Sequence, residues 1–138
     1  MKKQITAILL ATLMLLSFAL QSSAMVVDNA VSPCWTNMTQ VTIDIEFSDD
    51  NVGNASLLVS RAYGVTTSIE ATFYIYYKSA SGSWKYLDGT SGSSNGSLYL
   101  EVEFDAESGT EYKAVADITA NSQTLSESDT LYETRTCP

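Results

Sequence analysis

The sequence contains no histidine, and this absence removes several kinds of active site. Histidine is the usual general base near neutral pH and the commonest zinc ligand. A Ser-His-Asp or Cys-His catalytic site cannot be built without it. The sequence also lacks a Gly-rich phosphate-binding loop, a Cys-x-x-Cys pair and a dinucleotide-binding fingerprint. We therefore expect a non-enzymatic protein with no cofactor and no resident metal.

Carboxylates remain available for acid–base chemistry. Glu101 and Glu103 would point from one face of a strand, about 6.5–7 Å apart, which is close to the spacing in glycosidases. A glycosidase also needs a substrate cleft, which a single small β-sandwich seldom builds. We interpret the pair as part of a solvated strand face.

Acidic loops offer oxygen atoms that could bind Ca²⁺. Their spacing matches no standard calcium loop, and runs of Asp, Asn and Gly are ordinary turn chemistry. The residues concerned are Asp49, Asp50, Asn51 and Asn54 in one loop, and Asp105 and Glu107 in another.

Basic residues are scarce, with seven Lys and Arg against 16 Asp and Glu, so the net charge is −9. It becomes −11 without residues 1–24, because this segment contains two basic residues and no acidic one. A protein this acidic repels phosphate backbones and anionic lipids. We expect neither nucleic acid nor membrane as a partner.

Long apolar runs are limited to one, from Ile5 to Leu20. It follows Lys2 and Lys3 and precedes Ser22-Ser23-Ala24, which places small residues at the −3 and −1 positions of a cleavage site. The segment 1–24 is therefore predicted to be a signal peptide, and the mature protein to be secreted and extracellular. The 114 residues after cleavage suit one domain.

Apolar and polar residues alternate with period two through most of the chain after residue 39, which is typical of half-buried strands. No stretch after residue 25 shows a convincing helical period. We predict an all-β, seven-stranded antiparallel sandwich over residues 39–138, preceded by an irregular lead-in over residues 25–38. The expected strands are Val41–Phe47, Leu57–Tyr63, Ile69–Lys78, Trp84–Leu87, Leu98–Phe104, Tyr112–Ile118 and Gln123–Thr136. The last is the most polar and is expected at a sheet edge, and Asp88–Gly96 is expected to be a Ser/Gly loop.

The segment Gly109-Thr110-Glu111-Tyr112-Lys113-Ala114-Val115-Ala116 resembles the entry to strand F of immunoglobulin-like and fibronectin type III domains. The resemblance covers about Thr39 to Thr136 and implies an immunoglobulin-like sandwich. It also implies that Tyr112 forms a tyrosine corner, with its hydroxyl bonded to backbone a few residues upstream. More broadly, the chain is similar to small secreted proteins of Gram-positive bacteria that carry one such domain.

Two cysteines, Cys34 and Cys137, flank the predicted sandwich. An even pair in a secreted protein suggests a disulfide. However, seven alternating strands start at one end of a sandwich and finish at the other, and bridged Cα atoms must lie within about 7 Å. An intramolecular bridge therefore requires either that the lead-in folds back along the edge or that the number of strands differs by one from seven. Free thiols and intermolecular pairing remain alternatives.

Aromatic residues are the most suggestive feature for function. Tyr74, Tyr76 and Tyr99 are predicted to point outward, and would form an exposed stripe if their strands lie close together, with Trp84 or Tyr86 as candidates to extend it. Such a surface suits sugar rings or protein partners; cross-strand tyrosine pairs that only stabilise the sheet are the alternative. We expect a secreted module that binds an extracellular protein or glycan. The alternative function is a structural, self-associating surface protein that pairs through its edge strands.

Overall fold

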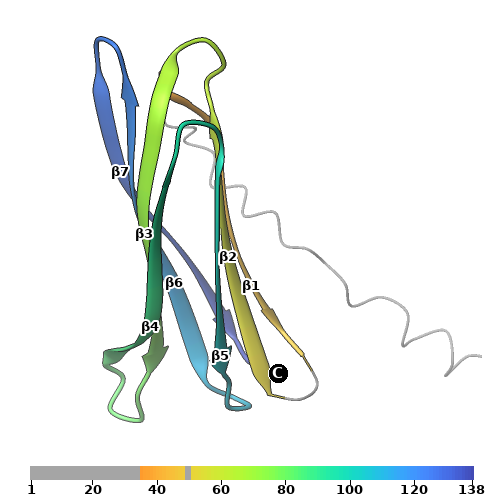
Figure 1. The fold of residues 1–138 in the computed structure, drawn as a ribbon. Helices are drawn as coiled ribbons and strands as arrows, with labels where there is room; N and C mark the ends of the chain where they lie inside the picture. Colours follow the sequence, from red (N-terminus) through yellow and green to blue (C-terminus); the bar gives the residue numbers. More distant parts are fainter. Residues whose placement is uncertain (1–34, 49–50) are drawn as a thin grey trace, which may run out of the picture. The chain divides into compact units, whose positions relative to one another are not determined.

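The computed structural model describes residues 35–48 and 51–138 as an all-β sandwich of seven antiparallel strands (Figure 1). The described ranges contain no helix, and hence none that could cross a membrane. The predicted fold class is confirmed. The strands are β1 (Met38–Phe47), β2 (Val52–Arg61), β3 (Thr66–Lys78), β4 (Trp84–Ser94), β5 (Leu98–Asp105), β6 (Glu111–Ser122) and β7 (Ser126–Thr136).

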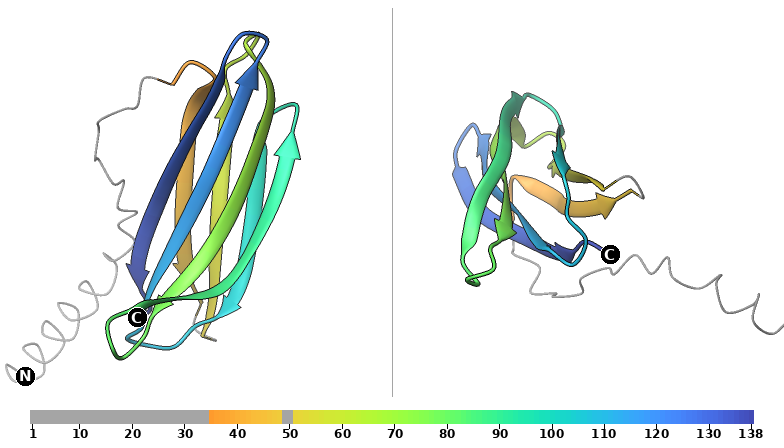
Figure 2. Two further views of the ribbon diagram at one scale, coloured as in Figure 1. Left: turned by 90° about the vertical axis from the view of Figure 1, so that its left-hand side faces the viewer. Right: turned by 90° about the horizontal axis from the view of Figure 1, so that it is seen from below.

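The strands form two sheets, one of three strands in the order β1-β2-β5 and one of four in the order β4-β3-β6-β7. The two layers face each other along their length (Figure 2). The chain crosses from one sheet to the other after β2, after β4 and after β5. The polar strand β7 lies at an edge of the four-stranded sheet, as its sequence predicts.

The core lies between the sheets and is made by alternate residues of most strands. The row from β3 has large side chains, whereas the row from β6 is rich in alanine, so that large and small residues interdigitate. The buried positions include Ile45, Leu57, Val59, Ile69, Phe73, Ile75, Val102, Phe104, Ala114, Ala116, Ile118 and Ala120. The period-two alternation therefore marks the inner faces correctly.

Three aromatic rings close one end of the core. The ring of Tyr112 lies 5.0 Å from that of Phe104 and 5.6 Å from that of Phe47, between centroids. Phe47 and Phe104 meet edge to face at 6.3 Å. Such tilted contacts are favourable beyond the apolar area they bury, so the group stabilises the end at which β1, β5 and β6 come together.

One expectation about local structure is wrong. The segment Asp88–Gly96 was expected to be a loop, yet β4 continues to Ser94 in register with β3. A Cβ at Gly89 would lie 2.7 Å from the Phe73 carbonyl oxygen, and one at Gly92 would lie 2.8 Å from a methyl group of Leu100. Pairing with β3 thus overrides the low strand propensity of Gly and Ser, and the glycines permit the close approach.

The residues just before β1 are attached to the opposite end of the sandwich from the aromatic trio. Asn37 is fully buried, and its Nδ2 donates to the carbonyl oxygens of Ala120 at 2.9 Å and Leu125 at 3.0 Å. Trp35 Nε1 donates to Asp129 Oδ2 at 3.0 Å. The folded unit therefore includes Trp35, four residues before the boundary expected at residue 39.

Replacing Asn37 by Ala should lower the free energy of unfolding by about 2 kcal/mol, because the buried carbonyl of Ala120 and the partly buried carbonyl of Leu125 lose their donor. Urea denaturation followed by fluorescence would measure this. Asn95→Ala is the control, since Asn95 is exposed and its side chain has no hydrogen-bond partner within the described ranges; its effect should stay within about 0.5 kcal/mol. Equal stability of the two variants would contradict the proposed role of Asn37.

Candidate binding face

Three tyrosines form a cluster on the outer face of the four-stranded sheet. Tyr74 and Tyr76 project from β3, and Tyr86 projects from the neighbouring strand β4, opposite Tyr76. Their ring centroids are 6.0–6.4 Å apart in all three pairs, with tilted or edge-to-face geometry. Tyr86 is the most accessible of the three, with 59% of its surface exposed. The rings support one another and still offer surface to solvent.

Two further aromatic side chains extend the cluster around Lys113. The Lys113 ammonium lies 4.5 Å from the ring centroid of Trp84 and 5.9 Å from those of Tyr76 and Tyr132. Tyr132 comes from β7 and is 70% exposed. Cation–π attraction therefore joins side chains from all four strands of the sheet. We call these six residues, Tyr74, Tyr76, Trp84, Tyr86, Lys113 and Tyr132, the aromatic patch.

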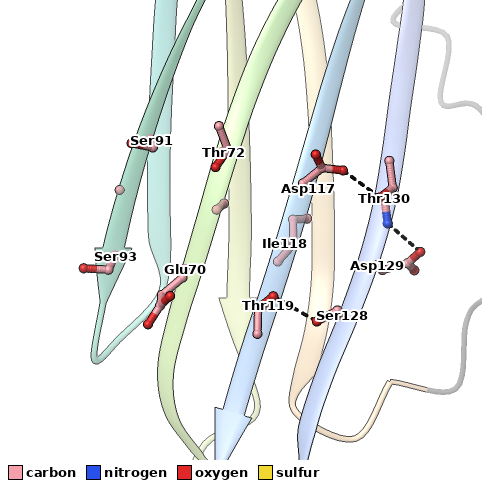
Figure 3. Close-up of a pocket in the computed structure, with 12 residues that line it drawn as sticks. Glu70, Thr72, Ser91, Ser93, Asp117, Ile118, Thr119, Ser128, Asp129 and Thr130 are labelled. Carbon is pink, nitrogen blue, oxygen red and sulfur yellow. Dashed lines mark hydrogen bonds between the residues drawn. The ribbon is translucent and has the colours of Figure 1, made fainter.

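An open groove of about 770 Å³ lies on the same sheet (Figure 3). Its lining is dominated by hydroxyl and carboxylate groups, with no lysine or arginine. The lining residues are Glu70, Ala71, Thr72, Ser91, Gly92, Ser93, Asp117, Ile118, Thr119, Ser128, Asp129 and Thr130. Thr72 and Tyr74 are successive outward residues of β3, so the groove and the aromatic patch are continuous.

The two sides of the groove differ in their hydrogen bonding. On β6 and β7, Thr130 Oγ1 donates to Asp117 Oδ1 at 2.6 Å, and the hydroxyls of Thr119 and Ser128 pair at 2.9 Å. On β3 and β4, Figure 3 draws no bond from the four polar side chains to the rest of the lining. These side chains are Glu70, Thr72, Ser91 and Ser93. That side can therefore bond to a ligand without breaking existing bonds within the lining.

Tyr99 does not join this face, which corrects the expectation of a stripe through Tyr74, Tyr76 and Tyr99. Tyr99 lies on β5, opposite Leu58 of β2, and is 58% exposed on the three-stranded sheet. The chain crosses to the other sheet between β4 and β5, so consecutive strands carry their outward residues to opposite sides of the molecule. Tyr74 and Tyr76 are brought together as expected.

Tyr112 is 3% exposed, and its hydroxyl accepts a hydrogen bond of 2.8 Å from the backbone N–H of Glu107, five residues upstream. Burial raises the pKa of the Tyr112 phenol, and the bond from Glu107 partly opposes this shift. This contact fixes the turn between β5 and β6. It contributes to stability and lies away from the aromatic patch.

Of the two cysteines of the predicted disulfide, Cys34 lies outside the described residues. Cys137 is buried and unbridged. Trp35 is attached near the start of β7 through Asp129, and the strand from Asp129 to Cys137 covers about 27 Å at 3.3–3.4 Å per residue. A bridge within one chain would therefore require Trp35 and Asn37 to leave their contacts with the β6–β7 end.

The remaining candidate sites are dispersed. Within residues 35–48 and 51–138, no three Cys, Asp or Glu side chains gather in a way that could hold a metal ion. Asp49 and Asp50 lie outside these ranges. Glu101 and Glu103 are exposed on the three-stranded sheet, and Glu101 accepts a hydrogen bond from Asn54.

The sequence analysis named Trp84 and Tyr86 as candidates to extend the tyrosine stripe, but it did not predict the roles of Lys113 and Tyr132 or the existence of the groove. Both of these residues point outward by alternation, which the sequence shows. What it does not show is that β6 lies between β3 and β7, which places Lys113 beside Tyr76 on one side and Thr134 on the other. The neighbours depend on strand order and register.

In comparisons with known proteins, no family model matches this chain, and no curated protein is similar to it in sequence.

Tyr112→Phe should lower the free energy of unfolding by about 1 kcal/mol, because the partly buried hydrogen bond from the Glu107 N–H is lost. Tyr77→Phe is a matched control, since Tyr77 packs against the core only partly buried and shows no side-chain hydrogen bond in the described chain. Chemical denaturation of both variants tests the difference. Equal effects would mean that the Tyr112 hydroxyl contributes nothing.

Glu133 should make stability depend on pH. Desolvation raises the pKa of this carboxyl above 4.5, Arg135 opposes the shift, and Asp44 adds to it. The folded state therefore holds its proton more tightly than the unfolded state, and stability should fall as the pH rises from about 4.5 through the folded pKa. Glu133→Gln should remove this part of the decline in urea denaturations at pH 4 and pH 7. An unchanged decline would show that other groups cause it.

Proposed function

We propose that this protein is a secreted, non-enzymatic module that binds a glycan on the outer face of its four-stranded sheet. The observation that carries the proposal is the continuity of the aromatic patch with a groove lined by hydroxyls and carboxylates. Both halves are presented by paired strands, so the face exists before any ligand arrives. Preorganisation of this kind lowers the ordering cost of binding.

The chemistry of the face matches that of a sugar chain. Tyrosine and tryptophan rings bury the apolar C–H faces of sugar rings, and their polar atoms remain able to form hydrogen bonds. Carboxylates and hydroxyls, such as those of Glu70, Thr72 and Ser91, accept and donate hydrogen bonds to sugar hydroxyls. A protein partner would need a larger apolar centre than this polar groove provides.

The length of the face indicates an oligosaccharide rather than a single sugar. Along β3, the outward row from Glu70 to Tyr76 covers about 20 Å at 3.3–3.4 Å per residue. The groove is open along its course, which suits internal segments of a chain. No enclosed pocket is needed for this kind of binding.

We also infer that the sandwich is of the immunoglobulin or fibronectin type III-like kind. Two features support this: the division into three- and four-stranded sheets, and the tyrosine at the start of the sixth strand bonded to upstream backbone. Such folds host many unrelated functions, so the fold itself does not name the ligand.

Self-association through a sheet edge is the second candidate function. The β7 edge is poorly suited to it, because Glu127 and Asp129 bond to the segment before β1, and Glu133 and Arg135 add charge. The opposite edge strand, β4, carries only Lys85 and Asp88 as charged residues. Of the two edges of this sheet, pairing between copies would therefore use β4.

Tyr76→Ala and Tyr86→Ala should each weaken glycan binding about tenfold or more, because each removes a ring of the patch. Glycan arrays would identify the ligand, and titration calorimetry would measure its affinity. Tyr99→Ala is the control, since it removes an equally exposed tyrosine from the other sheet and should leave binding unchanged.

Three results would contradict this proposal. The first is the absence of binding to any glycan, and the second is equal loss of binding in all three variants. The third is concentration-dependent oligomerisation in light scattering without glycan binding, which would favour the β4 edge instead.

A further inference from the structure

Positive charge is concentrated in the half of the four-stranded sheet that carries the aromatic patch. Two of the five basic residues that follow the predicted signal peptide lie on this outer face: Lys78 and Lys113. The strand register places Lys78 opposite Trp84 and Lys113 opposite Tyr76, whereas Lys85 lies opposite the inward-facing Tyr77 and so points to the other side of β4. This half of the face carries two lysines against one carboxylate, that of Glu111, in an otherwise strongly acidic protein.

Lys113 differs from Lys78 in having no carboxylate partner. Lys78 Nζ pairs with Glu111 Oε2 at 2.6 Å, and the second ion pair of the described chain joins Arg135 to Asp44. Neither includes Lys113. Its ammonium is held by three rings, and rings accept no conventional hydrogen bond from its N–H groups. The charge is therefore fixed in position, and its donors are free for an anion.

The outward neighbours of Lys113 support the same conclusion. Across the register it faces Tyr76 on β3 and Thr134 on β7, and neither carries a negative charge. Of the acidic side chains on this sheet face, Glu70 and Asp117 lie in the groove at the other half, and Glu111 is paired with Lys78. The face thus has one half that attracts an anion and one half that repels it.

We propose that the bound glycan carries an anionic sugar, whose charged group binds Lys113 while its ring contacts the aromatic patch. This rests on the proposed glycan-binding function. The adjoining sugars, over the groove, are uncharged, because Glu70, Asp117 and Asp129 would repel further negative groups. The ligand is therefore an oligosaccharide with a localised acidic sugar, and a continuous polyanion is excluded.

The test compares ligands that have nearly the same shape and differ by one negative charge. The probes are oligosaccharides ending in glucuronic, galacturonic or sialic acid, each measured with its methyl ester and its neutral parent by titration calorimetry. The wild-type protein should bind the acid about tenfold more tightly than the ester, and the difference should shrink at high salt. Lys113→Met should bind acid and ester equally, whereas Lys113→Arg should keep the preference.

Lys85→Met is the matched control for general electrostatic attraction, because it removes the same charge from a neighbouring strand, on the side of β4 that faces away from the patch. It should retain most of the preference for the acid. Equal binding of acid and ester by the wild-type protein would overturn the assignment of an anionic sugar and leave glycan binding intact. Absence of binding to every glycan, charged or neutral, would instead overturn the proposed function. An equal loss of preference in both variants would overturn the specific role of Lys113.

Discussion

The alternation of β3 is the constraint on which the rest of the molecule depends. Its inner row buries Ile69, Phe73 and Ile75 in the core, and its outer row presents Tyr74 and Tyr76. A shift of register by one residue would exchange the two rows, burying the tyrosines and exposing the core. The hydrophobic effect that fixes the inner row therefore also fixes the orientation of the proposed binding face.

The fold could be predicted largely from local pattern, because a strand that is buried on one side has apolar and polar residues in alternation. The period-two pattern failed in the second half of β4, where pairing with β3, and not the burial of apolar side chains, causes the strand to form. In β4, Gly89 and Gly92 allow a close approach to Phe73 and Leu100. The amino-acid composition of this segment, taken alone, resembles that of a loop. The same limit applies before β1, where Asn37 is held by hydrogen bonds to distant backbone, a relation that leaves no periodic signal.

The candidate site was harder to predict than the fold, because a face depends on which strands are neighbours. Tyr74 and Tyr76 share a strand, and their association follows from alternation alone. Trp84 and Tyr132 come from the two edges of the sheet and meet only through Lys113 on β6. Tyr99 has the same local pattern as Tyr74, yet it lies on the other sheet. Strand order, which local pattern does not encode, decided which aromatics meet.

The division of charge on the face follows from the same arrangement. Because β3 and β6 run antiparallel as neighbours, the end of β3 lies beside the start of β6, and this brings Lys78, Glu111 and Lys113 into one region. Glu111 is paired with Lys78, and Lys113 takes part in neither ion pair of the described residues. An acidic protein thereby keeps one fixed cation at the surface. Under the proposed function, repulsion from the rest of the molecule would weaken the binding of anions elsewhere, so that a ligand with a single negative group would bind in one position and in one direction along β3.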